Sequence, residues 1–370
     1  MSNLPASFIS EQDEARISCE RAVSELRYGR PVIVETDGLA YAALSLDTAT
    51  PEMVKRFAEI TQNQHELFLT KDRAGALDID APNGIFLALD GLTYDDITEI
   101  AYGRGTHQLP VWRSPLAPLT QFGRLARLAL LLPAFICLPI EEDDVRFDGC
   151  ARLPCSAFDD APVAEAEFSV VARTKVPLKG IEAAEFVVFR GGLAQRDQVA
   201  IVIGKPNLQK PVPVRIHSSC ITGDLFGSLK CDCGDQLREG ILLLEQRGGG
   251  ILLYLDQEGR GTGIAAKMRA YGYQEEGLDT IDADAQLGFD EDGRRYGAAV
   301  AMLEALGVTS VEMLTNNPRK IAALEKAGFD VHRRTPVLGV VTAENRNYLA
   351  TKANRSGHLL DVEAMRQAAE

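Results

Sequence analysis

The chain has 370 residues, of which 46% are hydrophobic and 25% are charged, a composition that excludes disorder as its main state. Because single cores rarely grow beyond about 250 to 300 residues, this length favours two domains. The 53 acidic and 39 basic side chains give a formal net charge of -14, which argues against nucleic acid as the partner.

The longest apolar stretch, 125–140, is interrupted by an arginine and two prolines and is shorter than the roughly 20 residues of a membrane-spanning helix. The first residues lack the basic and apolar regions of a secretory signal. Seven cysteines are an odd and modest number, which argues against a disulfide framework. We therefore expect a cytoplasmic protein without membrane contact, in which clustered thiols bind metal or take part in catalysis.

The chain up to residue 140 predicts helices alternating with strands. Thr50 is expected to open a helix, because a hydroxyl residue followed by proline and an acid is a helix start signal. Apolar spacing predicts the other elements: a helix at 14–26, strands at 31–35 and 40–46, and a helix followed by a strand within 125–140.

Residues 141–160 are rich in acids and small polar residues, which predicts a linker. We place the domain boundary near residue 160, which gives domains 1–160 and 161–370. Cys150 and Cys155 lie in this stretch. Without a third ligand close by, unpaired thiols are favoured over a metal site at this C-x4-C pair.

The second part of the chain predicts a β-rich lead-in and then alternating strands and helices, which favours a mixed α/β fold for the whole two-domain protein. A helix opened by Pro318 is expected to close at Gly328. The other expected elements are strands at 168–172, 186–189, 199–202, 212–216, 251–255 and 311–315, and helices at 235–246, 264–274 and 294–306.

Cys220, Cys231 and Cys233 give the strongest chemical signal, a C-x10-C-x-C pattern. Thiolates bind zinc, and a site with three protein ligands leaves a fourth position for water, as catalytic zinc sites do. Buried core cysteines are the structural alternative. Because Lys230 and Gly234 flank the last two cysteines, they occupy a polar loop, and the pattern predicts zinc.

Three further segments place polar or basic side chains beside an expected helix start. Residues 258–263, Glu-Gly-Arg-Gly-Thr-Gly, suit phosphate binding through their amides and arginine, although a tight turn also needs glycine. Residues 315–318, Thr-Asn-Asn-Pro, either cap a helix or bind a ligand, and both interpretations stay open. Asp292 and Arg294 are expected to open a helix. Without regard to the neighbouring motifs, a helix cap and a surface ion pair are favoured for these two residues over a role in catalysis.

Taken together, these motifs resemble GTP cyclohydrolase II, in matching order and spacing from about residue 170 to 360. The resemblance implies an enzyme that opens the imidazole ring of GTP, releases C8 as formate and cleaves off pyrophosphate in riboflavin synthesis. It also implies Zn²⁺, Mg²⁺ with the triphosphate, and a homodimer. The matching segments are R-I-H-S-S-C-I-T-G-D (215–224), S-L-K-C-D-C-G-D-Q-L (228–237), Y-L-D-Q-E-G-R-G-T-G (254–263), K-M-R-A-Y (267–271), Q-L-G-F (286–289), D-G-R-R-Y (292–296) and L-T-N-N-P-R-K (314–320).

The resemblance also implies roles for individual residues. The three cysteines match zinc ligands. Tyr271 matches a tyrosine that stabilises the addition step at C8. Asp292 and Arg294 match a proton acceptor and a nucleophile. The positions that match nucleotide contacts are Arg215, His217, Ser218, Ser219, Gln236, Glu258, Gly259, Arg260, Thr280, Thr315 and Lys320.

Two substitutions depart from the family pattern. Ser219 stands where many members have glutamate, and Asp256 stands where the family usually has arginine. The second places a negative charge near a polyanion site, so the choice among GTP, GDP and GMP stays open. Arginine side chains have a pKa above about 12, so Arg294 is either a phosphate clamp or an unusually perturbed nucleophile.

The N-terminal part resembles pieces of 3,4-dihydroxy-2-butanone 4-phosphate synthase. The acidic loop of that family should follow Glu35, where this chain has only a short turn, and the histidine expected ahead of Leu125 is missing, with Pro118 near its place. His65 and His107 lie outside the matching segments. We expect a degenerate domain without synthase activity. The matching segments are A-V-S-E-L-R-Y-G-R-P-V-I-V (22–34), T-P-E-M-V (50–54) and residues 125–140.

We therefore expect a zinc-dependent GTP cyclohydrolase II whose product is 2,5-diamino-6-(5-phosphoribosylamino)pyrimidin-4-one. One alternative is a hydrolase of the same family that acts in pyrimidine catabolism. Another is a nucleotide-binding regulator that has lost turnover. The complete set of cysteines, together with Tyr271, Asp292 and Arg294, argues against the regulator.

Overall fold

The computed structural model describes residues 9–36, 38–104, 109–115, 119–154, 156–158, 167–193, 196–290 and 292–360. It divides into two compact units. The first unit contains residues 1–164 together with 262–275 and 282–293, and the second contains 165–261, 276–281 and 294–370. The sequence predicts one domain over all of 161–370. The two short segments group with the N-terminal part instead, because their side chains and carbonyls hydrogen-bond with it.

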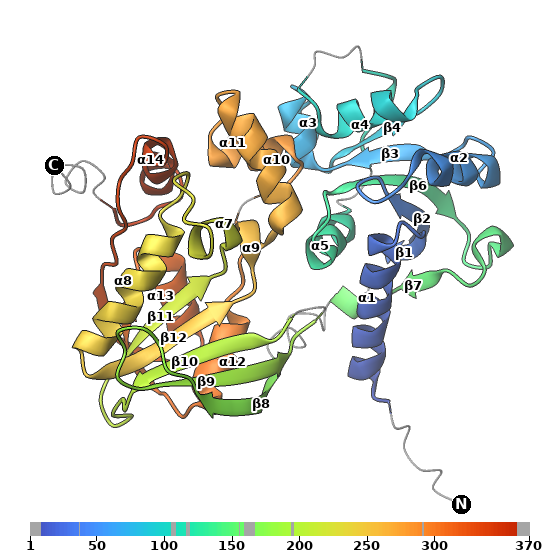
Figure 1. Cartoon of the computed structure of the whole chain (residues 1–370). Helices are drawn as coiled ribbons and strands as arrows, with labels where there is room; N and C mark the ends of the chain where they lie inside the picture. Colours follow the sequence, from blue (N-terminus) through green and yellow to red (C-terminus); the bar gives the residue numbers. More distant parts are fainter. Residues whose placement is uncertain are drawn as a thin grey trace, which may run out of the picture. The chain divides into compact units, whose positions relative to one another are not determined.

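The first unit is built on a sheet that, over the described residues, has seven strands in the order β5-β4-β3-β6-β2-β1-β7 (Figure 1). Neighbouring strands are antiparallel except for the parallel pair β1 and β7. The strands are β1 (Val32–Thr36), β2 (Leu39–Ser45), β3 (Glu66–Leu69), β4 (Ile85–Ala88), β5 (Trp112–Arg113), β6 (Ala134–Ile140) and β7 (Ala151–Leu153).

Helices of the first unit begin where the sequence provides caps. Thr50, for example, accepts a hydrogen bond from the backbone N–H of Met53 at the expected helix start. In α5, the ring of Phe122 packs against Tyr41, Phe68 and Phe135 of the sheet, with centroids 5.0 to 5.9 Å apart. The helices are α1 (Glu11–Arg27), α2 (Pro51–Ile60), α3 (Lys71–Ala76), α4 (Tyr94–Tyr102), α5 (Thr120–Ala129), η1 (Val145–Phe147) and α10 (Ile264–Glu275).

The linker predicted at 141–160 is wrong for most of its length. Strand β7 in this stretch pairs with β1, and Phe147, Leu153 and Phe158 are buried in the first unit. Acidic residues lie between these apolar residues, so the average composition of the segment indicates a linker although the apolar residues belong to the core of the first unit. Cys150 is half-buried, whereas Cys155 lies outside the described residues.

The sheet of the second unit, over the described residues, also has seven strands, in the order β14-β13-β11-β12-β10-β9-β8. The first four are parallel and the remaining neighbours are antiparallel, which matches the expected lead-in followed by alternation. The strands are β8 (Phe168–Lys175), β9 (Ala184–Gly191), β10 (Gln198–Gly204), β11 (Val212–Ser218), β12 (Gly249–Leu255), β13 (Ser310–Leu314) and β14 (Asp330–Thr335).

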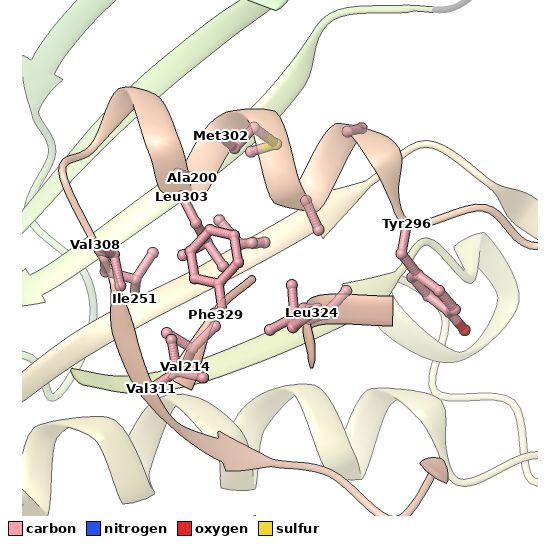
Figure 2. Packing of buried hydrophobic residues seen from close by; sticks show 14 of the residues in the cluster. Ala200, Val214, Ile251, Tyr296, Met302, Leu303, Val308, Val311, Leu324 and Phe329 are labelled. Carbon is pink, nitrogen blue, oxygen red and sulfur yellow. The ribbon is translucent and has the colours of Figure 1, made fainter. Parts of the chain in front are cut away.

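Helices cover both faces of this second sheet. On one face, Met302 and Leu303 of α12 and Leu324 of α13 pack with residues of β11, β12 and β13 (Figure 2). On the other face, Leu244 of α8 packs against Leu252. The helices are α7 (Ile221–Asp224), α8 (Cys233–Gln246), α9 (Glu258–Gly261), α12 (Gly297–Ala305), α13 (Pro318–Lys326) and α14 (Arg346–Asn354). Helix α11 (Thr280–Gln286) begins in the second unit and continues in the first.

The helix expected from residue 294 begins only at Gly297. The backbone N–H of Arg295 donates to Oε1 of Gln257 at 3.1 Å, so the chain before α12 is tied to the loop after β12. Asp292 and Arg294 therefore precede the helix and do not open it. Over the residues that the structure describes, no helix combines the length and apolar character needed to span a membrane.

Candidate active site

Three thiols come together in the second unit. The Sγ atoms of Cys220, Cys231 and Cys233 all lie within 4.8 Å of one another, and those of Cys220 and Cys231 are 3.7 Å apart. Sulfurs bound tetrahedrally to zinc at about 2.3 Å are separated by roughly 3.8 Å, so the spacing fits this metal. Within the described part of the chain, this is the one group of at least three His, Cys or acidic side chains close enough to share an ion.

Close packing of α7 and α8 brings the thiols together. Cys220 precedes α7 and Cys233 begins α8. A Cβ atom at Gly223 in α7 would lie only 2.9 Å from Sγ of Cys231 and 3.1 Å from Cβ of Cys233. A Cβ at Gly234 would lie 2.1 Å from the carbonyl oxygen of Gly223. The cluster therefore requires glycine at both positions, and both belong to the motif.

The thiols also affect one another's protonation. Hydrogen bonding to Cys220 raises the pKa of Cys231. Hydrogen bonds to Cys220 and Cys231, with burial, raise the pKa of Cys233 well above the usual thiol value. Because metal ligation requires thiolates, a divalent cation would have to displace these protons, and its charge would offset the repulsion among the resulting thiolates.

A buried ion pair between Asp232 and Lys352 lies next to the thiols. Asp232, between two of the cysteines, is fully buried. Its Oδ1 accepts a hydrogen bond from Nζ of Lys352 on α14 at 2.6 Å, and its Oδ2 accepts one from Nε2 of Gln236 at 2.5 Å. Burial opposes the charge of Lys352, but the charges of Asp232 and Cys233 outweigh it and raise the pKa of the lysine. The motifs do not predict this pair, because 120 positions separate its members.

Asp224 is a second buried group that sequence analysis missed. Its Oδ2 accepts hydrogen bonds from the backbone N–H of Cys220 at 3.0 Å and from the hydroxyl of Tyr254 at 2.8 Å. Nε2 of His217 lies 3.1 Å from both carboxylate oxygens. Burial is the main cause that lowers the pKa of His217, so this ring is neutral at pH 7. His217 thus orients Asp224, which fixes the backbone of the first thiol.

Arg215 lies beside this network and is buried. Its Nη1 donates to the carbonyl of Leu314 at 3.2 Å and its Nη2 donates to Oε1 of Gln236 at 3.1 Å. Burial lowers the pKa of Arg215 to about 10, which leaves it charged at pH 7. Among the described residues, Nε of Arg215 and Oγ of Ser219 are buried without a hydrogen-bond partner. Buried polar atoms of this kind are rare, and a polar ligand would satisfy them.

The loop after β12 is tied to the thiol cluster. Oε2 of Glu258 accepts a hydrogen bond from the backbone N–H of Ile221 at 2.6 Å, directly after Cys220. Gly259 and Arg260 both have φ of 62°, in the left-handed region. Glycine adopts this conformation freely, but for arginine it costs on the order of 1 kcal/mol or more. Such strain concentrates at ligand sites, which supports the assignment of Arg260 to one.

Of the two positions that depart from the family pattern, Asp256 has partners of its own, whereas the side-chain hydroxyl of Ser219 has none among the described residues. Asp256 is 3.9 Å from Nε of the exposed Arg196, which partly offsets the reversed charge. Its backbone N–H donates to Oε1 of Gln198 at 2.8 Å. Ser218, next to Ser219, accepts a hydrogen bond from Nε2 of Gln257 at 2.9 Å. The loop after β12 is therefore held by neutral amides as well as by charge.

The segment from Thr315 to Pro318 caps a helix, as one of the two interpretations predicts. Oδ1 of Asn317 accepts a hydrogen bond from the backbone N–H of Arg319 at 2.9 Å, and Oγ1 of the buried Thr315 accepts one from the N–H of Asn317 at 3.0 Å. Lys320 is buried in the first turn, where its Nζ donates to the carbonyl of Ile216 at 2.7 Å.

Several cations gather around His358. Burial and then the charges of Lys352, Arg294 and Lys320 lower its pKa to about 3. A local concentration of positive charge stands out in a chain whose net charge is -14. Such a cluster suits a polyanionic ligand such as a polyphosphate.

The remaining predicted site residues are divided between the units. Tyr271 and Asp292 belong to the first unit, whereas Thr280 and Arg294 belong to the second. Tyr271 lies on α10, where Nζ of Lys267 is 5.6 Å from the centroid of its ring.

The sequence model of the GTP cyclohydrolase II family matches residues 169–336. A protein named riboflavin biosynthesis protein RibBA from Bacillus mycoides (strain KBAB4) is 47% identical over 174 residues, which cover 47% of this chain and 44% of that protein. The solved structure of RibBX, a two-domain 3,4-dihydroxy-2-butanone 4-phosphate synthase from A. baumannii, covers 87% of this chain and 99% of its own at 15% identity. Its TM-score is 0.29, too low to support a conclusion about either unit.

Two relatives match nearly the whole chain, including its N-terminal part. A GTP cyclohydrolase-2 from Xylella fastidiosa (strain 9a5c) is 50% identical over 355 residues, which cover 95% of this chain and 89% of the relative. A GTP cyclohydrolase-2 from Azospirillum brasilense is 36% identical over 374 residues, which cover 96% of this chain and 97% of the relative. With identity at this level over almost its full length, the chain is an enzyme that belongs to the GTP cyclohydrolase II family.

Proposed function

We propose that this protein is a zinc-dependent GTP cyclohydrolase II that converts GTP to 2,5-diamino-6-(5-phosphoribosylamino)pyrimidin-4-one, formate and pyrophosphate in riboflavin biosynthesis, as a homodimer. The observation that carries the proposal is the buried cluster of Cys220, Cys231 and Cys233 with zinc-compatible spacing. The names of the two full-length relatives support the same reaction.

In this proposal the three thiols hold zinc, and the metal, when bound, supplies Lewis acidity toward a water in its open position. The chain's own contribution is to hold the ligands in place. Asp224 fixes the backbone at Cys220, and the pair of Asp232 and Lys352 fixes the loop between the other two cysteines. Water adds at C8 of the guanine and the C8–N9 bond breaks, which leaves a formamide on N7. A second water then hydrolyses the C8–N7 bond and releases formate.

The triphosphate is bound by cations of the second unit, with Mg²⁺ bound to the phosphates. Arg215, Lys320 and Arg294 supply the positive charge. Because arginine stays protonated, we assign Arg294 as a clamp on the α-phosphate and not as a nucleophile. A water then cleaves the bond between the α- and β-phosphates and releases pyrophosphate, with Asp292 as proton acceptor.

The two halves of the reaction can be tested separately. Tyr271→Phe should slow formate release while pyrophosphate release continues, because the hydroxyl acts at C8. Arg294→Ala should impair pyrophosphate release. Coupled assays of both products on purified variants check this. Equal loss of both products in Tyr271→Phe would show that the role of the tyrosine is assigned wrongly.

We also propose that the first unit makes no dihydroxybutanone phosphate. Glu35 is a carboxylate at the place where the acidic loop of the synthase family is expected, and it is paired with Nε of Arg152 at 3.1 Å. His65 is buried and lies 2.9 Å from the hydroxyl of Thr61, so it serves the core. His107, Asp37 and Pro118 lie outside the described residues. Turnover of ribulose 5-phosphate with Mg²⁺ by the purified protein would contradict the proposal.

A further inference from the structure

The residues 262–275 and 282–293, here called the α10–α11 segment, lie inside the region that matches the cyclohydrolase family but pack within the first unit. The segment contains Tyr271 and Asp292. Its contacts with the N-terminal residues are polar and specific, and they occur at three places along the segment. None of these contacts was predicted from the sequence.

The first contact is made by Arg73 of α3, whose side chain is 1% exposed. Its Nη1 donates to the backbone carbonyl of Gln286, at the end of α11, at 3.1 Å. Its Nε and Nη2 donate to the carbonyl of Ile100 at 3.0 and 2.7 Å, and Nη2 also donates to that of Gly103 at 2.8 Å. The guanidinium thus connects the C-terminal ends of two helices, α4 and α11.

Gln286 reinforces this connection. Its Nε2 donates to the carbonyl of Gly103 at 2.5 Å, so that carbonyl accepts hydrogen bonds from both Gln286 and Arg73. Burial of an arginine is costly unless its donors are satisfied, and here the planar fork reaches four separate carbonyls, the fourth being that of Glu99 at 3.5 Å. Lysine, with a single nitrogen, does not reproduce this geometry.

The second contact holds α10, the helix that contains Tyr271. The hydroxyl of Tyr273, two residues after Tyr271, donates to the carbonyl of Tyr102 at the end of α4. Nη1 of Arg269 is 2.9 Å from Oδ1 of Asp47, a carboxylate with only 7% of its side chain exposed. Tyr271 is therefore flanked on its own helix by two anchored residues.

The third contact holds the chain between α11 and Asp292. The hydroxyl of Thr70 donates to the carbonyl of Gly288 at 2.6 Å. Arg127 of α5 pairs with Asp290, and its guanidinium lies 5.5 Å from the centroid of the Phe289 ring. The backbone is thus held on the N-terminal side of Asp292.

We propose that the N-terminal part of the first unit serves the cyclohydrolase reaction by fixing the α10–α11 segment, with Arg73 as the central positioning residue. The proposal rests on the proposed function of Tyr271 and Asp292. It assigns the N-terminal part a role that does not require any synthase chemistry. Because the two side chains are attached to the segment, its position determines theirs, and small displacements of reacting groups cost large factors in rate.

The test compares Arg73→Met with Arg146→Met in the full-length protein. Arg146 is a matched control, since it lies in the same unit but is exposed and pairs locally with Asp144. Arg73→Met should lower kcat for formate release by on the order of tenfold to hundredfold. The KM for GTP should change by less than about twofold, because Arg73 touches none of the phosphate-binding residues. Hydrogen exchange should accelerate in the α10–α11 segment and stay unchanged in α8.

Tyr273→Phe provides a second variant, because it removes one hydroxyl and leaves the fold intact even if Arg73→Met does not fold. Tyr273→Phe should lower kcat by a smaller factor than Arg73→Met does. Tyr28→Phe, at an exposed tyrosine, should leave kcat unchanged. Arg73→Lys should resemble Arg73→Met, since charge alone does not span the four carbonyls.

The inference is overturned if exchange in the α10–α11 segment accelerates without loss of kcat, or if Arg146→Met loses as much activity as Arg73→Met. It is also overturned if exchange in the segment is unchanged in both Arg73→Met and Tyr273→Phe. These outcomes differ from failure of the proposed function, in which the unmodified protein itself releases no formate from GTP. In that case the exchange comparison still decides whether Arg73 holds the segment.

Discussion

The thiol cluster of the second unit and the α10–α11 segment of the first unit differ in what holds them. Around the thiols, most partners belong to the motifs themselves: Gly223, Asp224 and Gln236 lie within about 16 residues of Cys220 in the chain. The α10–α11 segment also contains motif residues, but Arg73 and Thr70, which hold it, lie roughly 200 positions earlier. Motifs therefore reveal the residues of a site much better than they reveal its supports.

The largest expected effect concerns the locally built region. Cys231→Ser should abolish formate release and reduce zinc content to near zero, because two thiolates and a neutral hydroxyl bind zinc far more weakly than three thiolates. Metal analysis of the purified variant, alongside activity, checks this. Cys150→Ser, at a half-buried cysteine of the first unit, is the control and should retain both. A fully active, zinc-free Cys231→Ser protein would contradict the metal assignment.

Lys352, a support of the thiol cluster that is distant in sequence, should give the next largest effect. Lys352→Met leaves the fully buried carboxylate of Asp232 without its cation and should lower the free energy of unfolding by about 3 to 5 kcal/mol. Chemical denaturation of the zinc-loaded protein measures this. Lys326→Met, at an exposed lysine of the same unit, should change stability by less than about 0.5 kcal/mol. A loss below about 1 kcal/mol in Lys352→Met would mean that water solvates Asp232.

A smaller effect should appear only in acid. Since burial and nearby cations lower the pKa of His358 to about 3, the unfolded chain binds a proton below pH 6.5 that the folded chain rejects. The contribution of the neutral His358 ring to the free energy of unfolding is therefore fully present above about pH 6.5 and is lost as the pH falls toward 3. At pH 5 the loss is about 2 kcal/mol, which His358→Gln should abolish.

Unfolding curves at pH 7 and pH 5 compare this variant with His332→Gln, at an exposed histidine on β14. The difference between the two pH values should shrink in His358→Gln and stay as in the unmodified protein in His332→Gln. An unchanged pH dependence in His358→Gln would show that the ring is not held neutral by its surroundings.

Elements with strong local signals were predictable from the sequence. Thr50 caps α2 as expected, and the thiols were placed together from spacing alone. Strand β7 was missed because acids dominate the composition of its segment, although Phe147 and Leu153 are buried. In that case the tertiary environment of a few apolar residues outweighed the average polarity of the stretch.

The missed parts of the site have a different cause. Asp232 is charged and follows a cysteine in a polar loop, so sequence alone favours an exposed side chain. Its burial depends on Lys352, and the position of α10 depends on Tyr102 and Asp47. Each of these pairs forms only when distant parts of the chain have already packed, which no local pattern records.

The most direct test of the central claim is to incubate the purified, full-length protein with GTP and Mg²⁺ and to measure formate, pyrophosphate and bound zinc together. We predict one zinc per chain, release of both products in equal amounts, and loss of formate release when the metal is removed and its recovery when zinc is restored. Absence of formate from a zinc-loaded protein, or undiminished formate release after the zinc is removed, would contradict the account.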